Sequence, residues 1–123
     1  MSKTPLLLAL LMQACIHGDG MILAAGNVVT PDNRPAGPCA IAITTSRKPP
    51  TKQWSWRAFQ GQFREGTVSQ YKRSYIHIQC DGWSPVVRTA VYLRDKGWST
   101  DSSRFFPVSE PLDLGTIVLR PLP

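Results

Sequence analysis

Proline and glycine punctuate this chain so regularly that they limit it to short segments of regular structure. The sequence contains eleven prolines and nine glycines, and these gather with other turn-forming residues in segments such as 31–38. Proline lacks a backbone donor and glycine loses much backbone entropy on ordering, so both disfavour long helices. The chain is therefore expected to consist of short strands joined by turns.

The segments between these turns alternate apolar and polar residues with the period of two that is typical of β-strands. Over residues 75–80, one face carries Ile76, Ile78 and Cys80, and an Asp-Gly turn follows. Gly26 lies inside another such segment and predicts a bulge or a close backbone approach. Strands are also predicted over residues 21–30, 39–45, 54–60, 62–64, 86–94 and 114–119, with a turn at Glu65-Gly66. The sequence thus predicts an all-β fold, a single antiparallel β-sandwich of about seven strands.

Two cysteines occupy core-facing positions of separate predicted strands. Cys39 shares its face with Ile41 and Ile43, and Cys80 lies on the apolar face of the central strand. A disulfide between Cys39 and Cys80 is expected, either across the sandwich or between neighbouring strands. The alternative is a pair of reduced cysteines that pack as small hydrophobic residues.

The N-terminus has the pattern of an export signal. Lys3 precedes the apolar run 6–12, which is too short to span a bilayer. Ala14-Cys15 then resembles the bacterial lipobox, in which the cysteine is lipidated and becomes the first mature residue; Met12 stands where that motif prefers leucine. The resemblance implies lipidation at Cys15. The alternative is an ordinary signal peptide cut nearby, for instance at Gly20, which would discard Cys15.

A lipidated Cys15 would place the protein in a bacterial cell envelope. Ile16 is not the aspartate that marks inner-membrane retention in similar Gram-negative lipoproteins, so the periplasmic face of the outer membrane is the expected location. The expected division is a signal peptide over 1–14, a short tether over 15–21 and one sandwich domain over 22–123.

The formal net charge of +6 predicts affinity for anionic surfaces. The basic residues are spread along the chain, and the stretch that interleaves them with aromatic residues, 47–64, is better explained as a solvated rim in an exported chain. Nucleic acid is therefore not an expected partner. The expected partners are the membrane, through the lipid anchor, and a protein or glycan of the envelope.

Tryptophan supplies the candidate binding residues. Trp54 and Trp56, two positions apart, are expected to share one strand face, flanked by Lys52 and Arg57. They can form part of the core, or they can form an exposed platform on which a sugar ring or a partner side chain stacks. Trp98, in a long polar loop, is expected to pack back onto the body of the domain.

No catalytic or metal-binding constellation stands out. His77 is interpreted as a sheet-surface residue, because its parity places it opposite Ile76 and Ile78. Four convergent zinc ligands are not available, no Gly-x-Ser-x-Gly motif accompanies the serines, and the carboxylates fall in or beside turns. The sequence therefore implies no catalytic residues, no metal and no cofactor.

Several short pieces, taken in order, resemble the carboxypeptidase regulatory-like domain, a transthyretin-like or prealbumin-like sandwich. The matching pieces are Gly26-Asn27-Val28, Asp32-Asn33-Arg34-Pro35, residues 40–43, Gly61-Gln62-Phe63, residues 75–78, Gly82-Trp83 and residues 113–119. Phe59-Gln60 replaces the Thr-Asp that many members carry before Gly-x-Phe. The resemblance implies a mostly non-catalytic accessory, adhesion or sugar-binding domain.

The resulting prediction is a non-catalytic envelope lipoprotein that serves as a binding or structural module and contacts a protein or a carbohydrate. The alternative is a small secreted hydrolase accessory, or a carbohydrate-binding module that uses exposed tryptophans.

Overall fold

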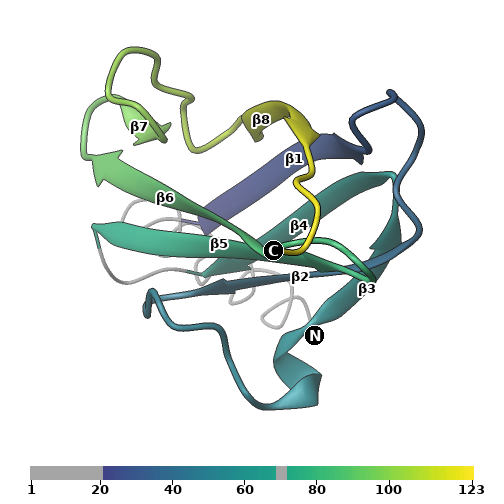
Figure 1. The fold of residues 1–123 in the computed structure, drawn as a ribbon. Helices are drawn as coiled ribbons and strands as arrows, with labels where there is room; N and C mark the ends of the chain where they lie inside the picture. Colours follow the sequence, from purple (N-terminus) through teal and green to yellow (C-terminus); the bar gives the residue numbers. More distant parts are fainter. Residues whose placement is uncertain (1–20, 69–71) are drawn as a thin grey trace, which may run out of the picture.

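Eight β-strands form the regular structure of the part of the chain that this computed structural model describes, residues 21–68 and 72–123 (Figure 1). They are β1 (Met21–Val29), β2 (Pro38–Thr44), β3 (Arg57–Gln60), β4 (Gln62–Val68), β5 (Arg73–Cys80), β6 (Val86–Leu93), β7 (Gly97–Ser99) and β8 (Leu112–Val118). A 3₁₀ turn, η1 (Gln53–Ser55), precedes β3. The expected signal peptide, Cys15 and most of the tether lie outside the described residues, and Met21 already belongs to β1.

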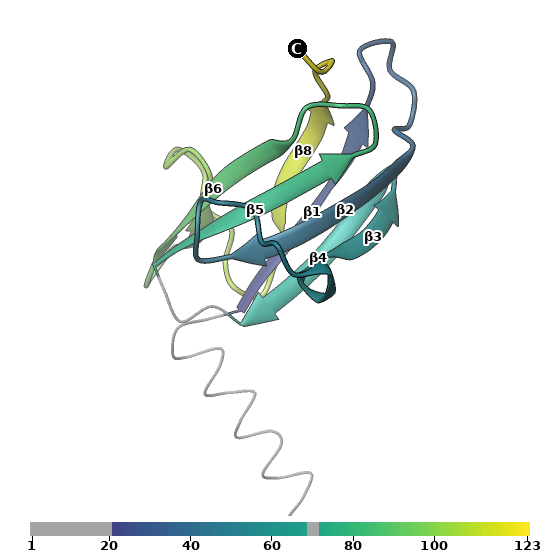
Figure 2. The same ribbon diagram turned by 60° about the horizontal axis from the view of Figure 1, so that its bottom comes forward.

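The strands pair in the order β7-β6-β5-β2-β3-β4-β1-β8, and every pair is antiparallel except β1 with β8. β3 and β4 are paired only at Gln60 and Gln62, on either side of Gly61. The positive φ of Gly61, 75°, suits glycine and allows the sharp bend. The sheet folds over at this bend into two layers, β7-β6-β5-β2-β3 and β4-β1-β8 (Figure 2). The predicted all-β sandwich with mainly antiparallel sheets is confirmed.

The core lies between the two layers and is supplied by alternate residues of every long strand, as the period of two requires. Its largest members include Ile22, Ile76 and Ile78, each fully buried. The other buried apolar residues of this cluster are Ala24, Val28, Ala36, Cys39, Ile41, Phe63, Cys80, Ala90, Trp98, Leu112, Ile117 and Leu119. Burial of these side chains is the main stabilising contribution to the fold.

The cysteines are joined by a disulfide, and it connects neighbouring strands rather than opposite layers. Cys39 on β2 lies directly across from Cys80 on β5, with a Cα–Cα distance of 4.0 Å. The bridge closes a loop with a sequence separation of 41 residues. On the chain-entropy model, such a bridge stabilises the fold by about 4 kcal/mol.

Gly26 makes the close approach that the sequence predicts. A Cβ atom at this position would lie 2.8 Å from the carbonyl oxygen of Gly115 and 2.9 Å from Cζ of Phe63. The pairing of β1 with β8 also shifts register between Ala25 and Asn27, which is the signature of a bulge. The absence of a side chain therefore allows β8 to pack beside β1.

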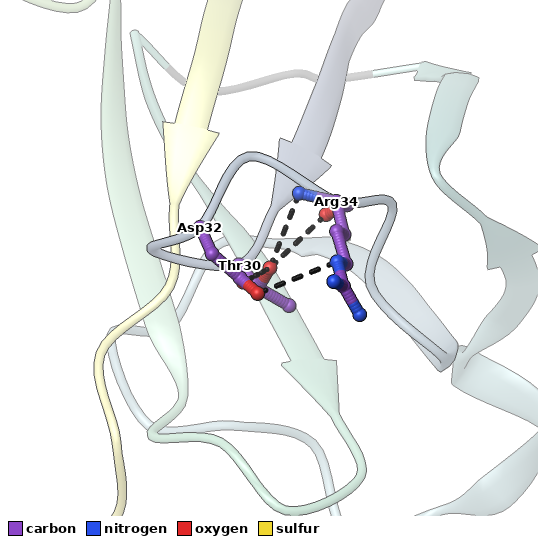
Figure 3. A network of polar contacts seen from close by, with 3 residues as sticks. All are labelled: Thr30, Asp32 and Arg34. Atoms are coloured by element: carbon purple, nitrogen blue, oxygen red, sulfur yellow. Dashed lines mark hydrogen bonds and ion pairs between the residues drawn. The ribbon is translucent and has the colours of Figure 1, made fainter.

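The turn after β1 is a self-contained polar network (Figure 3). The hydroxyl of Thr30 donates to Oδ1 of Asp32 and accepts from the backbone N–H of Arg34 at 3.2 Å. Asp32 Oδ2 also pairs with Nε of Arg34 at 3.4 Å, and Asn33 takes a φ of 63°. Both charges are exposed, so the pair adds little stability and mainly fixes the turn.

The loop after β6 returns an aromatic residue to the core, as predicted. Trp98 on β7 is only 2% exposed, and its Nε1 donates to the carbonyl oxygen of Met21 at 3.0 Å. Its ring packs against Tyr92 with centroids 5.2 Å apart, and its backbone exchanges two hydrogen bonds with Phe106. β7 was not predicted, because three residues are too few to show an alternating pattern.

Two other sequence predictions are wrong. The strand predicted from residue 54 begins only at Arg57, because Gln53–Ser55 form the 3₁₀ turn. Glu65-Gly66 is not a turn but lies inside β4, which continues to Val68. β4 stays extended because Gly66 pairs with Leu23 and the ladder with β1 covers the whole strand.

Candidate functional site

A cleft of about 290 Å³ opens between β2 and β4, at the end where β3 no longer separates them. We call it the β2–β4 cleft. Its lining residues are Ile41, Ala42, Ile43, Thr44, Trp54, Ser55, Arg57, Glu65, Gly66 and Thr67. The cleft exists because β3 is short: it pairs with β2 only from Pro38 to Ile41, and β2 continues beyond that point to Thr44.

Trp54 lies on the rim of this cleft, in η1, and is 78% exposed. No other large apolar side chain in the described segments is as exposed. Two backbone hydrogen bonds hold the turn: Ser55 N–H donates to the carbonyl of Lys52, and Trp56 N–H to that of Gln53, both at 3.1 Å. The indole is thus displayed to solvent by an ordered piece of backbone.

The opposite wall of the cleft is polar. Glu65 and Thr67 follow the buried Phe63 at alternate positions of β4, so they point toward the space between the layers. Glu65 Oε2 pairs with Nε of Arg57 at 3.7 Å, which links β4 to the start of β3. The guanidinium is largely exposed, and the side chain of the glutamate is 28% exposed. The cleft therefore combines an aliphatic wall on β2 with a charged wall on β4.

His77 is buried, which corrects the expectation of a surface residue. Its parity does place it on the outer face of β5, but the loop 45–56 covers that face and leaves the side chain 1% exposed. Its Nε2 lies 2.9 Å from the carbonyl oxygen of Ser46 and 3.0 Å from Oγ1 of Thr44. A carbonyl only accepts, so Nε2 carries the proton. Nδ1 is buried and has no hydrogen-bond partner among the described residues.

Trp56 is the second anchor of the loop. Its ring meets His77 edge-on, with centroids 6.3 Å apart and an interplanar angle of 67°. Its Nε1 donates to the carbonyl oxygen of Pro50 at 3.1 Å. Trp56 and His77 together hold the loop against β2 and β5, where Figure 2 shows it crossing the outer face of the sheet.

The expectation that Trp54 and Trp56 share one face is therefore wrong. η1 interrupts the strand alternation between them, so Trp54 faces solvent at the cleft while Trp56 is partly buried beside His77. Of the four candidate binding residues, the structure brings together Trp54 and Arg57. Trp56 supports the loop, and Lys52 is exposed next to η1 but does not line the cleft.

The residues that sequence reasoning missed are Ile43, Glu65 and Thr67. Their strands were identified or partly identified, but their position at a cleft depends on where β3 begins. The alternation of Phe63, Glu65 and Thr67, which puts polar residues in register with a buried one, was the available signal.

Other features of the described chain are weaker candidates for a functional site than the β2–β4 cleft. A larger hollow of about 660 Å³ lies over β5 and β6 and is lined by Lys72, Arg73, Tyr75, Leu93 and their neighbours, but the two strands are fully paired there. Within residues 21–68 and 72–123, no three His, Cys, Asp or Glu side chains gather as a metal site would require. The same residues contain no helix that is long and apolar enough to cross a membrane.

Comparison with known proteins gives no relative: no family model, no curated protein and no solved structure matches this chain.

Proposed function

We propose that this protein is a non-catalytic binding domain and that its ligand occupies the β2–β4 cleft. The observation that carries the proposal is Trp54, a large apolar side chain held 78% exposed on the rim of a cleft by a hydrogen-bonded turn. Exposed aromatic residues of this kind are enriched at binding surfaces, where they bury large areas on contact.

The state of His77 favours binding over catalysis. The imidazole is enclosed under the loop 45–56, and its Nε2 proton is engaged by Ser46 and Thr44. A general base must come within hydrogen-bond reach of its substrate, and this side chain does not line the cleft. The cleft instead offers an indole, a guanidinium and a carboxylate, which suit recognition.

The test is a direct binding screen with paired variants. Wild-type protein, Trp54→Ala and Val118→Ala are applied to a peptide array and a glycan array. Val118 is a suitable control because it is 56% exposed on β8 and lies outside the cleft lining. Ligands of the wild type should lose about tenfold or more in affinity with Trp54→Ala and bind Val118→Ala normally. A lack of response on both arrays, or an equal loss in both variants, rules the proposal out.

A carbohydrate-binding module is the second candidate, and Trp54 also favours it. An exposed indole is a flat apolar surface on which a sugar ring can stack, and Arg57 nearby can donate to hydroxyl groups. Quenching of tryptophan fluorescence by oligosaccharides, absent in Trp54→Ala, would favour this candidate. A response confined to peptides would eliminate it.

The proposed location is the bacterial envelope, with the protein anchored through a lipidated Cys15. The Cys39–Cys80 disulfide supports export, because structural disulfides form in oxidising compartments. In cells, Cys15→Ser should release the protein from the membrane fraction. If the variant stays with the membrane as the wild type does, the anchor is wrong.

A further inference from the structure

The unpaired strand edges of the β2–β4 cleft indicate what kind of ligand it takes. We propose that the ligand is an extended, acidic peptide segment of another protein, which adds as a short strand between β2 and β4 and continues the line of β3. This inference rests on the proposed binding function and specifies its partner. It follows from three observations: where β3 ends, where the backbone groups of β2 point, and the charge around the rim.

The first observation is that β3 leaves a vacant strand position. Its ladder with β2 runs from Pro38–Gln60 to Ile41–Arg57 and then stops. The same register would place Ser55 opposite Ile43, but Ser55 is part of the 3₁₀ turn. On the other side, β4 pairs with β3 only at Gln62, although β4 continues to Val68. β3 reaches along β4 only as far as the contact between Arg57 and Glu65. Beyond it, a strand position is open between the end of β4 and the last residues of β2.

The second observation is that the backbone of Ile43 points into this position. Residues opposite one another in an antiparallel pair alternate between wide pairs that exchange hydrogen bonds and narrow pairs that do not. Cys39 and Cys80 form a narrow pair, with Cα atoms 4.0 Å apart. Ile43 lies four residues further along β2 and has the same parity, so its N–H and C=O point away from β5. They point to the side that β3 has left.

A peptide is the ligand class that satisfies such an edge. Its backbone can donate to and accept from Ile43, which is the chemistry of strand addition. A sugar can stack on Trp54 but cannot reproduce the spacing of strand hydrogen bonds. One side of an added strand would face the indole of Trp54, and the other would face Glu65 and Thr67 of β4.

The third observation is the charge of the rim, which selects an acidic peptide. The segment 45–57 carries four basic residues, Arg47, Lys48, Lys52 and Arg57, and no acidic one. All four are exposed. Their field attracts acidic partners and speeds encounter, and added salt screens it. Within the cleft, Glu65 is already engaged by Arg57, so the uncompensated charge is positive.

The experiment first selects peptides that bind the domain and then measures hydrogen exchange of the Ile43 amide in their presence. A randomised peptide library is panned against the folded wild-type domain, and enriched peptides are synthesised and titrated at two salt concentrations. Enriched sequences should be acidic, free of proline and able to form a strand, and their affinity should fall as salt rises. Hydrogen exchange of single amides is then followed by NMR. At a peptide concentration about ten times Kd, exchange of the Ile43 amide should slow about tenfold.

Ala42 and Thr44 are internal controls, because their backbone groups already face β5 and should show little change. Ile43→Pro removes the N–H on the open edge and should abolish binding. Because this variant can also perturb packing, the exchange measurement on the wild type decides the question.

The possible outcomes separate this inference from the proposed function. Slowed exchange at Ile43 with an acidic peptide supports strand addition. Peptides that need Trp54 but leave Ile43 exchange unchanged overturn strand addition and keep the binding function, and so does binding of glycans alone. Slow Ile43 exchange without peptide, together with a dimer in light scattering, means that a second copy fills the position and overturns the inference. If neither peptides nor glycans bind, both proposals fail.

Discussion

Two loops of this domain each carry a tryptophan, and they place it in opposite ways. In the loop after β6, Trp98 is 2% exposed, with its Nε1 bonded to Met21 and its ring packed on Tyr92. In the loop after β2, Trp54 is 78% exposed on a turn at the cleft. The first loop closes its side of the sandwich, and the second leaves its side open.

The difference lies in how each loop is anchored. Trp98 is itself the anchor of its loop, so its burial is explained by the fold. The loop 45–56 is held instead by His77 and Trp56, which bond to Ser46 and Pro50, while Trp54 stays 78% exposed. A large aromatic side chain exposed on the rim of a cleft is suited to a contact with another molecule. This contrast is the basis for the proposed binding site.

The contrast between a structural Trp98 and an exposed Trp54 is tested most directly by truncating each tryptophan. Trp98→Ala removes a fully buried aromatic ring and should lower the free energy of unfolding by about 3–5 kcal/mol. Trp54→Ala should change it by less than about 0.5 kcal/mol, as is usual at exposed positions. Urea denaturation followed by circular dichroism measures both. Equal losses in the two variants would show that Trp54 is structural and would remove the reason for calling it a binding residue.

The disulfide links β2 to β5 at the end of β2 that lies away from the cleft, and its contribution to stability can be measured. Replacing both Cys39 and Cys80 with alanine should lower the free energy of unfolding by about 2–4 kcal/mol, because the unfolded chain gains entropy. Thermal denaturation measures the loss, with reduced wild-type protein as the comparison. Stability equal to that of the oxidised wild type would contradict a structural role for the bridge.

The anchors of the loop 45–56 can be tested through His77. His77→Ala removes a buried ring and one of the two donors to the carbonyl of Ser46, the other being the hydroxyl of Thr44, and should cost about 1–3 kcal/mol in the free energy of unfolding. His77→Gln retains an N–H donor and should lose less. Limited proteolysis reports on the loop itself, which should be cut faster in His77→Ala. If cleavage of the loop is unchanged, His77 does not hold it.

The smallest effect is expected at Asp101, in the closing loop that also contains Trp98. Hydrogen bonds from the backbone and hydroxyl of Ser103, and from the backbone of Arg104, hold the pKa of this carboxyl below its ordinary value of 3.8. Because the folded pKa is depressed, its contribution to stability is present above pH 3.8 and is lost as pH falls through the folded pKa. NMR titration of the carboxyl should give a midpoint below 3.8 that is shifted upward in a Ser103→Ala variant. A midpoint at or above 3.8 in the wild type contradicts this account.

The parts of this fold that could be predicted from sequence are those that the period of two determines. β1, β2, β5 and β6 all lie within about two residues of the segments predicted for them, the usual uncertainty at the ends of elements. The facing positions of Cys39 and Cys80 also followed from parity, although parity alone did not say whether they lie in one layer or two. The structure places them in one.

The site could be predicted only in part, because it depends on interruptions of that period. η1 interrupts the alternation between Trp54 and Trp56. Gln53–Ser55 contain no glycine or proline from which this turn could have been predicted. His77 has the parity of an outward residue, and only a loop that folds back over the sheet makes it buried. Glu65-Gly66 has turn-forming composition but is held extended by pairing with β1. In each case a tertiary contact overrides the local preference.

The parallel pairing of β1 with β8 has a consequence for when this domain can fold. The hydroxyl of Thr116 donates to the side chain of Asn27 at 3.0 Å, and these two residues are 89 positions apart in the sequence. β1 therefore acquires its second neighbour only after β8, residues Leu112–Val118, has been made. Contacts of such long range slow folding, and an unfinished chain exposes the edge of β1 to pairing with other molecules. The sheet can thus be completed only after β8 has been synthesised.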